Sequence, residues 1–320
     1  MKLERGPLPL AAWKKRERGL VRLARNIRRD KFLLLLVSPA LAYYLLFEYL
    51  PMYGVIIAFK DFSPMKGILG SPWAGLKWFQ QFFDSIYAAR VIKNTLLLST
   101  YMLLWSFPVP ILFALLLNEL KNALFKRVVQ TVSYLPHFIS IVVISGMIIS
   151  FLSPAEGVVN MLLVQLGIGP INFLNEPDWF RTIYIGSGIW QTFGWSSIIY
   201  LAAIMSIDPS LYEAAKMDGA KRWQGILYIT IPGILPTIII LLIMNLGHMM
   251  SVGFEKIILL YNPATYEVSD VISTFVYRRG LEGAEYGFAA AVGLFNSVVN
   301  FTLLVMVNRI SRKISGIGLW

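Results

Sequence analysis

Cysteine is absent from this 320-residue sequence, and histidine occurs only twice, at His137 and His248. Disulfide bonds and thiolate chemistry are therefore excluded, and two histidines are too few for an ordinary catalytic zinc site. The sequence also lacks the Gly-x-x-x-x-Gly-Lys-Ser/Thr loop that binds the phosphates of ATP. No Ser/His/Asp set stands in a plausible order and no acidic pair lies inside an apolar run, so we do not expect this chain to be an enzyme.

Charged residues are scarce as well. They make up 15% of the sequence, against about 25% in soluble domains, while 57% of the residues are hydrophobic. Several apolar runs reach the roughly 20 residues that a helix needs to cross a bilayer. We therefore predict an all-α integral membrane protein with six transmembrane helices and no soluble domain of its own. The predicted spans cover residues 32–59, 94–117, 129–152, 179–207, 229–254 and 286–310.

Positive charge gathers in a few short segments. The net charge is +11, and residues 1–31 alone hold eleven Lys/Arg against three Asp/Glu. Six spans would place the other Lys/Arg-rich segments, 121–127, 216–222 and 309–313, on the same side as both termini. The positive-inside rule makes that side cytoplasmic, and the basic arm suits anionic lipid rather than nucleic acid. The predicted domains are this arm, residues 1–31, and a six-span membrane domain over residues 32–320.

A short polar loop, residues 208–228, separates the fourth and fifth predicted spans. Asp208 can cap a helix, Pro209 suits its first position, and Gly219 can take the left-handed conformation that ends one. The predicted helix has about ten residues and a length of roughly 15 Å. One face of it, by i, i+3, i+4 spacing, holds Leu211, Ala214 and Ala215. A helix this short is marginal alone in water, so we expect it to rest on another surface, either a protein or the membrane.

The same stretch carries a spaced motif, Glu213-Ala214-Ala215, then Gly219, then Ile229-x-Ile231-Pro232. The motif resembles the EAA signature of the membrane subunits of ABC importers, with Ile231 in place of the usual leucine. In that family the loop forms a cytoplasmic coupling helix that sits in a groove of an ATPase subunit. The resemblance therefore implies an ATPase-coupling role for Leu211, Glu213, Ala214, Ala215, Asp218, Gly219 and Pro232.

Resemblance to one branch of this family extends over nearly the whole chain. Residues 51–63, 130–140 and 195–203 look like permeases for pectin-type oligosaccharides and other polysaccharide fragments, with alginate importer permeases as the leading match. Phe254-Glu255-Lys256 and the terminal Gly318-Leu319-Trp320 look like the same branch. The resemblance implies a type I ABC importer fold in the bacterial inner membrane and import of oligosaccharides by alternating access.

Partners and cofactors follow from the same resemblance. It implies a second homologous permease subunit, two ATP-binding cassette ATPase subunits and an extracytoplasmic solute-binding protein. ATP and magnesium would be bound by the ATPase subunits, and this chain would bind no cofactor of its own. Its other contacts would be membrane lipid and the oligosaccharide substrate.

Polar and aromatic residues within the spans are candidates for a sugar path, because sugars offer hydroxyl groups on their rims and C–H faces that pack on rings. Gln191 and Trp195 share a helix face at i, i+4, and Asn245 and His248 share one at i, i+3. By their spacing from the motif, some of these also resemble positions that contact sugar in the family. The predicted cavity residues are Gln191, Trp195, Asn245, His248, Met249 and Asn296. Each could instead join neighbouring helices, as Asn, Gln and His often do in membranes.

Basic residues in the outer segments bear on the charge of the substrate. Lys60, Lys66, Lys256, Arg278 and Arg279 would all lie outside the membrane on the side opposite the basic arm. They could attract an acidic sugar such as an alginate or pectin fragment. They could equally be interfacial anchors or ion-pair partners.

A second class of function is an ion-coupled secondary sugar transporter. Such a transporter needs intramembrane carboxylates or an inverted repeat. Glu48 is the only acid well inside an apolar run, and the two halves of the sequence show no clear self-similarity. A bound ATPase subunit would favour the importer hypothesis, and transport by the chain alone would favour this alternative.

Overall fold

The computed structural model describes residues 29–319 and divides after Ile56 into two units. Residues 1–28 of the predicted basic arm lie outside the described residues. The first unit is a helical run made of α2 (Lys31–Tyr43), η1 (Tyr44–Tyr49), α3 (Leu50–Met52) and the start of η2 (Tyr53–Phe59).

This first helical run is apolar on every face. No residue of α2, η1 or α3 is buried, and Glu48 in η1 is exposed as well. The run extends over Lys31–Phe59, close to the predicted first span. A helix of this kind belongs in lipid or against another membrane helix, because exposing its apolar side chains to water is unfavourable in free energy.

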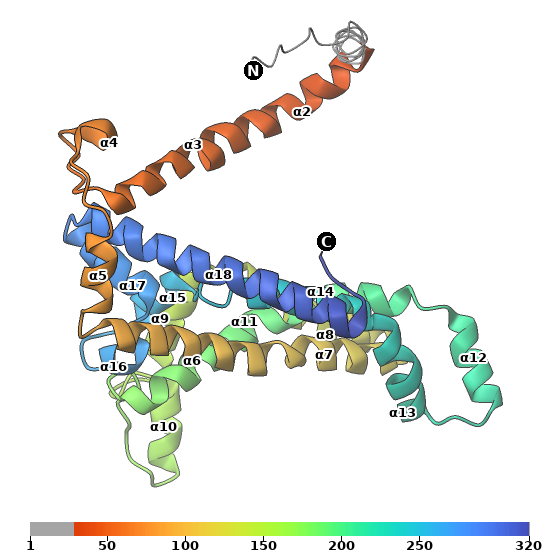
Figure 1. The fold of residues 1–320 in the computed structure, drawn as a ribbon. Helices are drawn as coiled ribbons and strands as arrows, with labels where there is room; N and C mark the ends of the chain where they lie inside the picture. The colour runs from red at the N-terminus through yellow and green to blue at the C-terminus, as the bar shows by residue number, and fades with distance from the viewer. Residues whose placement is uncertain (1–28, 320) are drawn as a thin grey trace, which may run out of the picture. The chain divides into compact units, whose positions relative to one another are not determined.

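The second unit is a set of long helices with short helices at both ends (Figure 1). Its first half consists of α4 (Gly67–Gly70), α5 (Lys77–Phe83), α6 (Ala88–Ser106), α7 (Pro108–Glu119), α8 (Ala123–Tyr134), η3 (Leu135–Phe138), α9 (Ile141–Phe151) and α10 (Val158–Gln165). Its second half consists of α11 (Pro177–Met205), α12 (Pro209–Met217), α13 (Arg222–Gly225), η4 (Ile226–Thr230), α14 (Ile231–Gly247), α15 (Phe254–Leu260), α16 (Tyr266–Ser269), α17 (Ile272–Tyr277), η5 (Arg278–Glu282) and α18 (Tyr286–Ser315).

The predicted membrane spans correspond to these helices. Four helical runs in the described part of the chain are long and apolar enough to cross a membrane: Lys31–Phe59, Ala88–Glu119, Arg222–Gly247 and Tyr286–Ser315. Two further candidates are bent pairs, α8–η3 with α9 at 98° and α11 with α12 at 68°. The six predicted spans are obtained when each bent pair counts as one span.

The third predicted span is not one straight helix. It breaks at Ile139 and Ser140, where Ser140 caps α9 by accepting a hydrogen bond from the backbone N–H of Val143 at 3.3 Å. Pro136 lies just before the break and has no N–H to continue the helical ladder. The side chain of Gln191 in α11 donates to the carbonyl of Ile139 at 3.3 Å, so the break is satisfied from a neighbouring helix.

The fifth span ends at Gly247, although the apolar run predicts a helix to Phe254. Residues 248–253 form an irregular turn before α15. The side-chain oxygen of Asn300 in α18 accepts a hydrogen bond from the backbone N–H of Met250 at 2.8 Å. Hydropathy alone conceals this break, because the group that stabilises the freed backbone lies on another helix.

Helix α11 is the centre of the second unit and packs against α6, α7, α8 and α14. Near its C-terminal end, Tyr200, Leu201 and Ile204 form a buried cluster with residues of α7 and α14. Where α11 crosses α8, a Cβ at Gly194 would overlap the carbonyl oxygen of Ser133. The absence of a side chain at Gly194 therefore sets the closest approach of these two helices.

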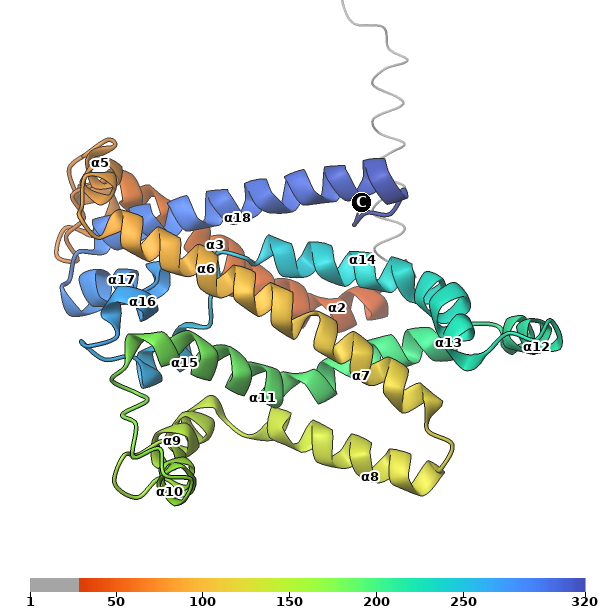
Figure 2. The same cartoon turned by 90° about the horizontal axis from the view of Figure 1, so that it is seen from below.

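The two ends of the second unit differ in character. Helices α5, α16 and α17 lie at one end, and α12, α13 and the end of α18 lie at the other (Figures 1 and 2). The turn between α7 and α8 lies at the α12 end as well. The three Lys/Arg-rich segments 121–127, 216–222 and 309–313 are thus gathered at one end of the unit, as the topology requires.

The packing at Gly194 gives a stability prediction. The substitution Gly194→Ala should lower the free energy of unfolding by about 1–3 kcal/mol, because the added methyl group forces α8 and α11 apart. The matched control is Gly186→Ala in the same helix, where a Cβ meets nothing within 4 Å. Thermal unfolding of the detergent-solubilised protein measures both, and equal midpoints for the two variants would contradict the packing argument.

Candidate functional site

A cavity of about 770 Å³ lies in the second unit between α6, α7, α11, α14 and the turn at 248–253. Its wall is mostly apolar, with residues such as Met102, Leu103 and Phe107. Hydrogen-bonding groups enter it at a few points: Ser106, Thr192, Tyr200, Asn245 and His248. A few polar groups in an apolar wall, within a volume of roughly 300–1,000 Å³, are typical of small-molecule sites.

The cavity brings together four of the predicted site residues, Trp195, Asn245, His248 and Met249. His248 does not share a helix face with Asn245, because α14 ends at Gly247 and His248 stands in the turn. Both nevertheless reach the same cavity.

The structure places the other two predicted cavity residues elsewhere. Gln191 bonds the carbonyl of Ile139 and is not part of the cavity wall. Asn296 lines a separate hollow of about 460 Å³ beside α17, η5 and α18. Asn300 holds the turn before α15, with its amide nitrogen donating to the hydroxyl of Ser251 at 3.0 Å. On α11, a side chain that joins helices, Gln191, and one that lines the cavity, Trp195, thus lie one turn apart.

The indole of Trp195 is the largest flat surface on the cavity wall. Trp195 is 42% exposed, and its ring is stacked on His137 with 4.7 Å between centroids and 3° between planes. The ring of Phe138 meets the indole edge-on at 5.4 Å. Both supporting rings come from η3, so the break in the third span positions the Trp195 ring. No local signal pairs His137 with Trp195, because the two lie far apart in the chain.

The turn at 248–253 forms a part of the cavity wall that is bonded to α6. The hydroxyl of Ser99 in α6 donates to the carbonyl of Met249, and both residues line the cavity. Asn245, in the last turn of α14, donates from its side-chain nitrogen to the carbonyl of Leu241 at 2.8 Å. The position of this wall therefore depends on where α14 ends.

The predicted coupling helix forms as α12, and its ends follow the local signals. A side-chain oxygen of Asp208 accepts from the backbone N–H of Ser210 at 2.9 Å, and the hydrogen bonds from Ser210 lower the pKa of the Asp208 carboxyl. After the helix, Gly219 has φ +79°, in the left-handed region. Leu211 is 52% exposed and Met217 is 89% exposed. An apolar surface of this kind on a short helix is suited to a partner protein.

Tyr212 connects α12 to the membrane helices. Its hydroxyl hydrogen-bonds the hydroxyl of Thr230 at 2.9 Å, and Thr230 is buried at the end of the π-helical turn η4. Pro232 follows near the start of α14, within the run that ends at the cavity. Glu213, Ala214 and Asp218 are exposed, so the motif residues themselves are accessible to a partner. Tyr212 was not singled out from the sequence, since its partner Thr230 belongs to the next helix.

A comparison with known proteins identifies the chain's family. Residues 106–316 match the family described as "Binding-protein-dependent transport system inner membrane component". The chain belongs to this family. It is therefore the permease of an ABC importer, and the ATP that drives such an importer is hydrolysed by separate ATPase subunits.

Relatives of this permease include two proteins of Bacillus subtilis (strain 168). It is 44% identical over 306 residues to the polygalacturonan/rhamnogalacturonan transport system permease protein YteP, covering 96% of this chain and 94% of that protein. It is 42% identical over 294 residues to protein LplB, covering 92% of both chains.

Solved structures confirm the predicted fold of the permease. A chain of a bacterial ABC transporter involved in the import of the acidic polysaccharide alginate is 50% identical, with a TM-score of 0.86 over 92% of this chain and 99% of that one. A chain of a bacterial alginate ABC transporter in complex with an alginate pentasaccharide-bound periplasmic protein is 49% identical. Its TM-score is 0.87 over 93% of this chain and 100% of that one. The ABC importer fold that the motif implied is thus the fold of this permease.

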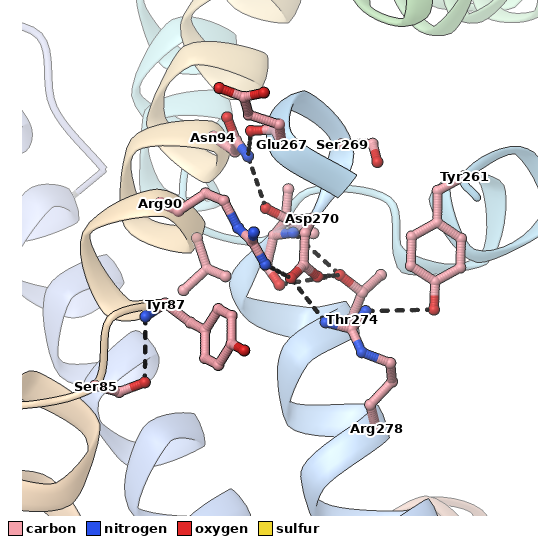
Figure 3. Close-up of polar contacts among 12 residues, drawn as sticks. Ser85, Tyr87, Arg90, Asn94, Tyr261, Glu267, Ser269, Asp270, Thr274 and Arg278 are labelled. Carbon is pink, nitrogen blue, oxygen red and sulfur yellow. Dashed lines mark hydrogen bonds and ion pairs between the residues drawn. The ribbon is translucent and has the colours of Figure 1, made fainter. Parts of the chain in front are cut away.

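The end of the permease opposite α12 is held by a buried ion cluster (Figure 3). Asp270 is fully buried and pairs with Arg278 at 2.7 Å and with Arg90 at 3.2 Å. The hydroxyl of Thr274 donates to the same carboxylate at 2.8 Å, and the side chain of Asn94 donates to the Asp270 carbonyl at 3.0 Å. These contacts join α17 to α6. Because one Asp270 carboxylate serves two arginines, removing it would leave two half-buried cations unpaired.

The Tyr212–Thr230 contact gives a coupling prediction. Tyr212→Phe and Thr230→Val should each lower the number of sugars transported per ATP hydrolysed by about fivefold, because each removes a hydrogen bond worth roughly 1 kcal/mol. The double variant should lower this ratio by no more than either single variant, since both substitutions remove the same hydrogen bond. Uptake and phosphate release by the reconstituted complex give the ratio.

Tyr228→Phe is the matched control for this cycle, because Tyr228 is exposed on the same π-helical turn. It should leave the coupling ratio unchanged. Additive losses in the Tyr212/Thr230 double variant would mean that the two hydroxyl groups act independently.

Proposed function

We propose that this permease imports acidic oligosaccharides, such as fragments of alginate or pectin, across the bacterial inner membrane by alternating access. The observation that carries the proposal is the cavity of about 770 Å³ with the supported Trp195 ring and a few hydrogen-bonding groups on its wall. The similar proteins point to the same substrates, since their names or titles include polygalacturonan, rhamnogalacturonan and alginate.

The working complex contains a second homologous permease, two ATPase subunits and an extracytoplasmic solute-binding protein. Two exposed apolar surfaces support these partners. The first unit has no buried residue in α2, which leaves it free to pack against lipid and a second permease. Helix α12 exposes Leu211 and Met217 for an ATPase groove. ATP and magnesium are bound on the ATPase subunits, and this chain binds no cofactor.

The orientation places both termini, the basic arm over residues 1–31 and the coupling loop 208–228 in the cytoplasm. The gathering of segments 121–127, 216–222 and 309–313 at the α12 end supports it, since Lys/Arg-rich short loops stay inside. The six-span membrane domain over residues 32–320 then has α5, α16 and α17 on the outer side, where a loaded binding protein docks.

Motion passes from the ATPase subunits to the cavity through a short path. When ATP closes the ATPase dimer, the groove moves α12, and the Tyr212–Thr230 hydrogen bond carries that motion to η4 and α14. Helix α14 ends at the cavity, where Asn245 and His248 stand on its wall. The cavity thereby opens and closes in step with ATP binding. The family assignment leaves no support for the ion-coupled alternative.

The coupling loop gives a sharp test. Gly219→Val should reduce ATP-driven uptake at least tenfold while membrane insertion stays intact, because a β-branched residue is strained at φ +79°. Gly219→Asn is the matched control, since asparagine tolerates the left-handed region, and it should retain most of the uptake. Uptake of labelled trigalacturonate or alginate trimer into proteoliposomes holding the whole complex measures both variants. Normal uptake with Gly219→Val would remove the coupling role of the loop.

The cavity wall gives a second test. Trp195→Leu should lower the affinity for oligosaccharide by about tenfold, because a leucine side chain offers no flat face for a sugar ring. Trp190→Leu is the control: Trp190 is similarly exposed on α11 but is not part of the cavity wall. Binding to the nanodisc-embedded complex and uptake into proteoliposomes should both be weaker for Trp195→Leu than for Trp190→Leu. An equal loss in both would point to a general effect on α11.

A further inference from the structure

The structure separates the five basic residues that the sequence placed on the outer side. Arg278 pairs with Asp270 at 2.7 Å, and Arg279 pairs with Glu285 at 2.6 Å. The remaining three are lysines: Lys60, Lys66 and Lys256. Each of these two arginines therefore already has a carboxylate partner within the protein, which Arg278 shares with Arg90.

Two of the lysines also have ordinary surroundings. Lys60 donates to the carbonyls of Ile68 at 2.6 Å and Ser71 at 3.2 Å, so it holds the loop after η2 in place. Lys66 is exposed on the same loop. Neither lysine is part of the cavity wall described above.

Lys256 is different, because it is a buried cation without a paired carboxylate. It lies on α15, outside the candidate spans, and is only 6% exposed. Its ammonium donates to the carbonyl of Tyr184 at 3.0 Å and lies 5.1 Å from the centre of the Tyr184 ring. Within residues 29–319 no ion pair to Lys256 is formed, and the neighbouring Glu255 is exposed.

Such an arrangement is energetically costly in isolation. A buried charge is normally paired, and the carbonyl and ring contacts of Lys256 compensate only part of the lost hydration. Burial lowers the pKa of Lys256 to about 8, which leaves the side chain mainly protonated at neutral pH. The positive charge is therefore present at the pH of the cell, although no carboxylate among residues 29–319 forms an ion pair with it.

The Lys256 ammonium lies directly behind the cavity wall. Tyr184, its hydrogen-bond partner, lines the cavity. A Cβ at Gly188 would lie 3.6 Å from the Lys256 nitrogen and 2.8 Å from the terminal methyl group of Met102, which also lines the cavity. One layer of side chains thus separates the charge from the space that a sugar would fill. Across such a layer of low dielectric constant, the Lys256 charge interacts strongly with a charge in the cavity.

We propose that Lys256 is a specificity residue whose positive charge favours sugars that carry carboxylates over neutral sugars in the transport cavity. The proposal rests on the proposed function and names the residue that would give the cavity its preference for acidic substrates. Residues 29–319 form no ion pair with Lys256, and the carboxylate of a bound uronate supplies this counter-charge. The substrate carboxylate and the Lys256 ammonium attract each other across the low-dielectric layer of side chains.

The test uses two ligands that share the same sugar rings but differ in charge. Trigalacturonate carries a carboxylate on each ring, and its methyl ester keeps the rings but is neutral. Binding of both is measured on the whole permease–ATPase complex in nanodiscs, without the solute-binding protein, so that the preference of that protein does not enter. Lys256→Gln should weaken the binding of trigalacturonate by about tenfold and change that of the ester by less than twofold. Lys256→Arg should keep the preference.

The matched control is Lys66→Gln, which removes an exposed outer lysine and should change neither affinity. Lys256→Met fills a similar volume without charge and repeats the test if Lys256→Gln assembles poorly. Equal weakening of both ligands, unchanged binding of both, or failure of both neutral variants to assemble would overturn the proposal and show a structural role for Lys256.

The proposed function itself is tested separately on the wild-type complex. ATP-driven uptake of trigalacturonate or alginate trimer, with the solute-binding protein present, supports acidic oligosaccharide import. If the wild-type complex instead transports only neutral sugars, the proposed function fails before any Lys256 variant is compared. A wild-type complex that transports uronates but whose Lys256→Gln variant keeps its preference contradicts the Lys256 proposal alone.

Discussion

Every break in a membrane helix exposes backbone groups that lipid cannot hydrogen-bond, and the cavity of this permease depends on how two such breaks are satisfied. At the break between η3 and α9, Gln191 bonds the free carbonyl of Ile139. At the turn after α14, Asn300 accepts from the N–H of Met250. The first break supports the Trp195 ring, and the second provides the part of the cavity wall formed by residues 248–253. The irregular segments are therefore what shape a sugar-sized space between otherwise regular helices.

Helix α14 joins the two functional parts of the permease. At one end it follows the π-helical turn η4, whose Thr230 is bonded to Tyr212 of the coupling helix. At the other end it stops at Gly247, where the cavity wall begins. In the proposed mechanism this helix is the link by which a partner on α12 acts on a cavity that the partner does not touch.

Charge is distributed unevenly over the part of the second unit away from α12. In the cluster around Asp270 one carboxylate pairs with both Arg90 and Arg278, and its contacts fasten α17 to α6. Lys256 stands apart from this cluster, buried against Tyr184 with no carboxylate of the described chain beside it. A protein keeps a buried uncompensated charge at a cost in stability, which is reasonable where the charge serves binding. The arginines of the Asp270 cluster have a carboxylate partner and Lys256 has none in the described chain, which is why we relate Lys256 to the charge of the substrate.

The amino-acid sequence by itself determined the membrane class, the approximate spans and the ends of the coupling helix. Apolar runs, the cap at Asp208 and the left-handed Gly219 are local signals, and each acts within a few residues. Only the tertiary structure decided that Gln191 joins helices while Trp195 faces the cavity, and that Lys256 lacks the partner that Arg278 has. These outcomes depend on neighbours far away in the chain, and hydropathy and spacing carry no information about which side chain meets which.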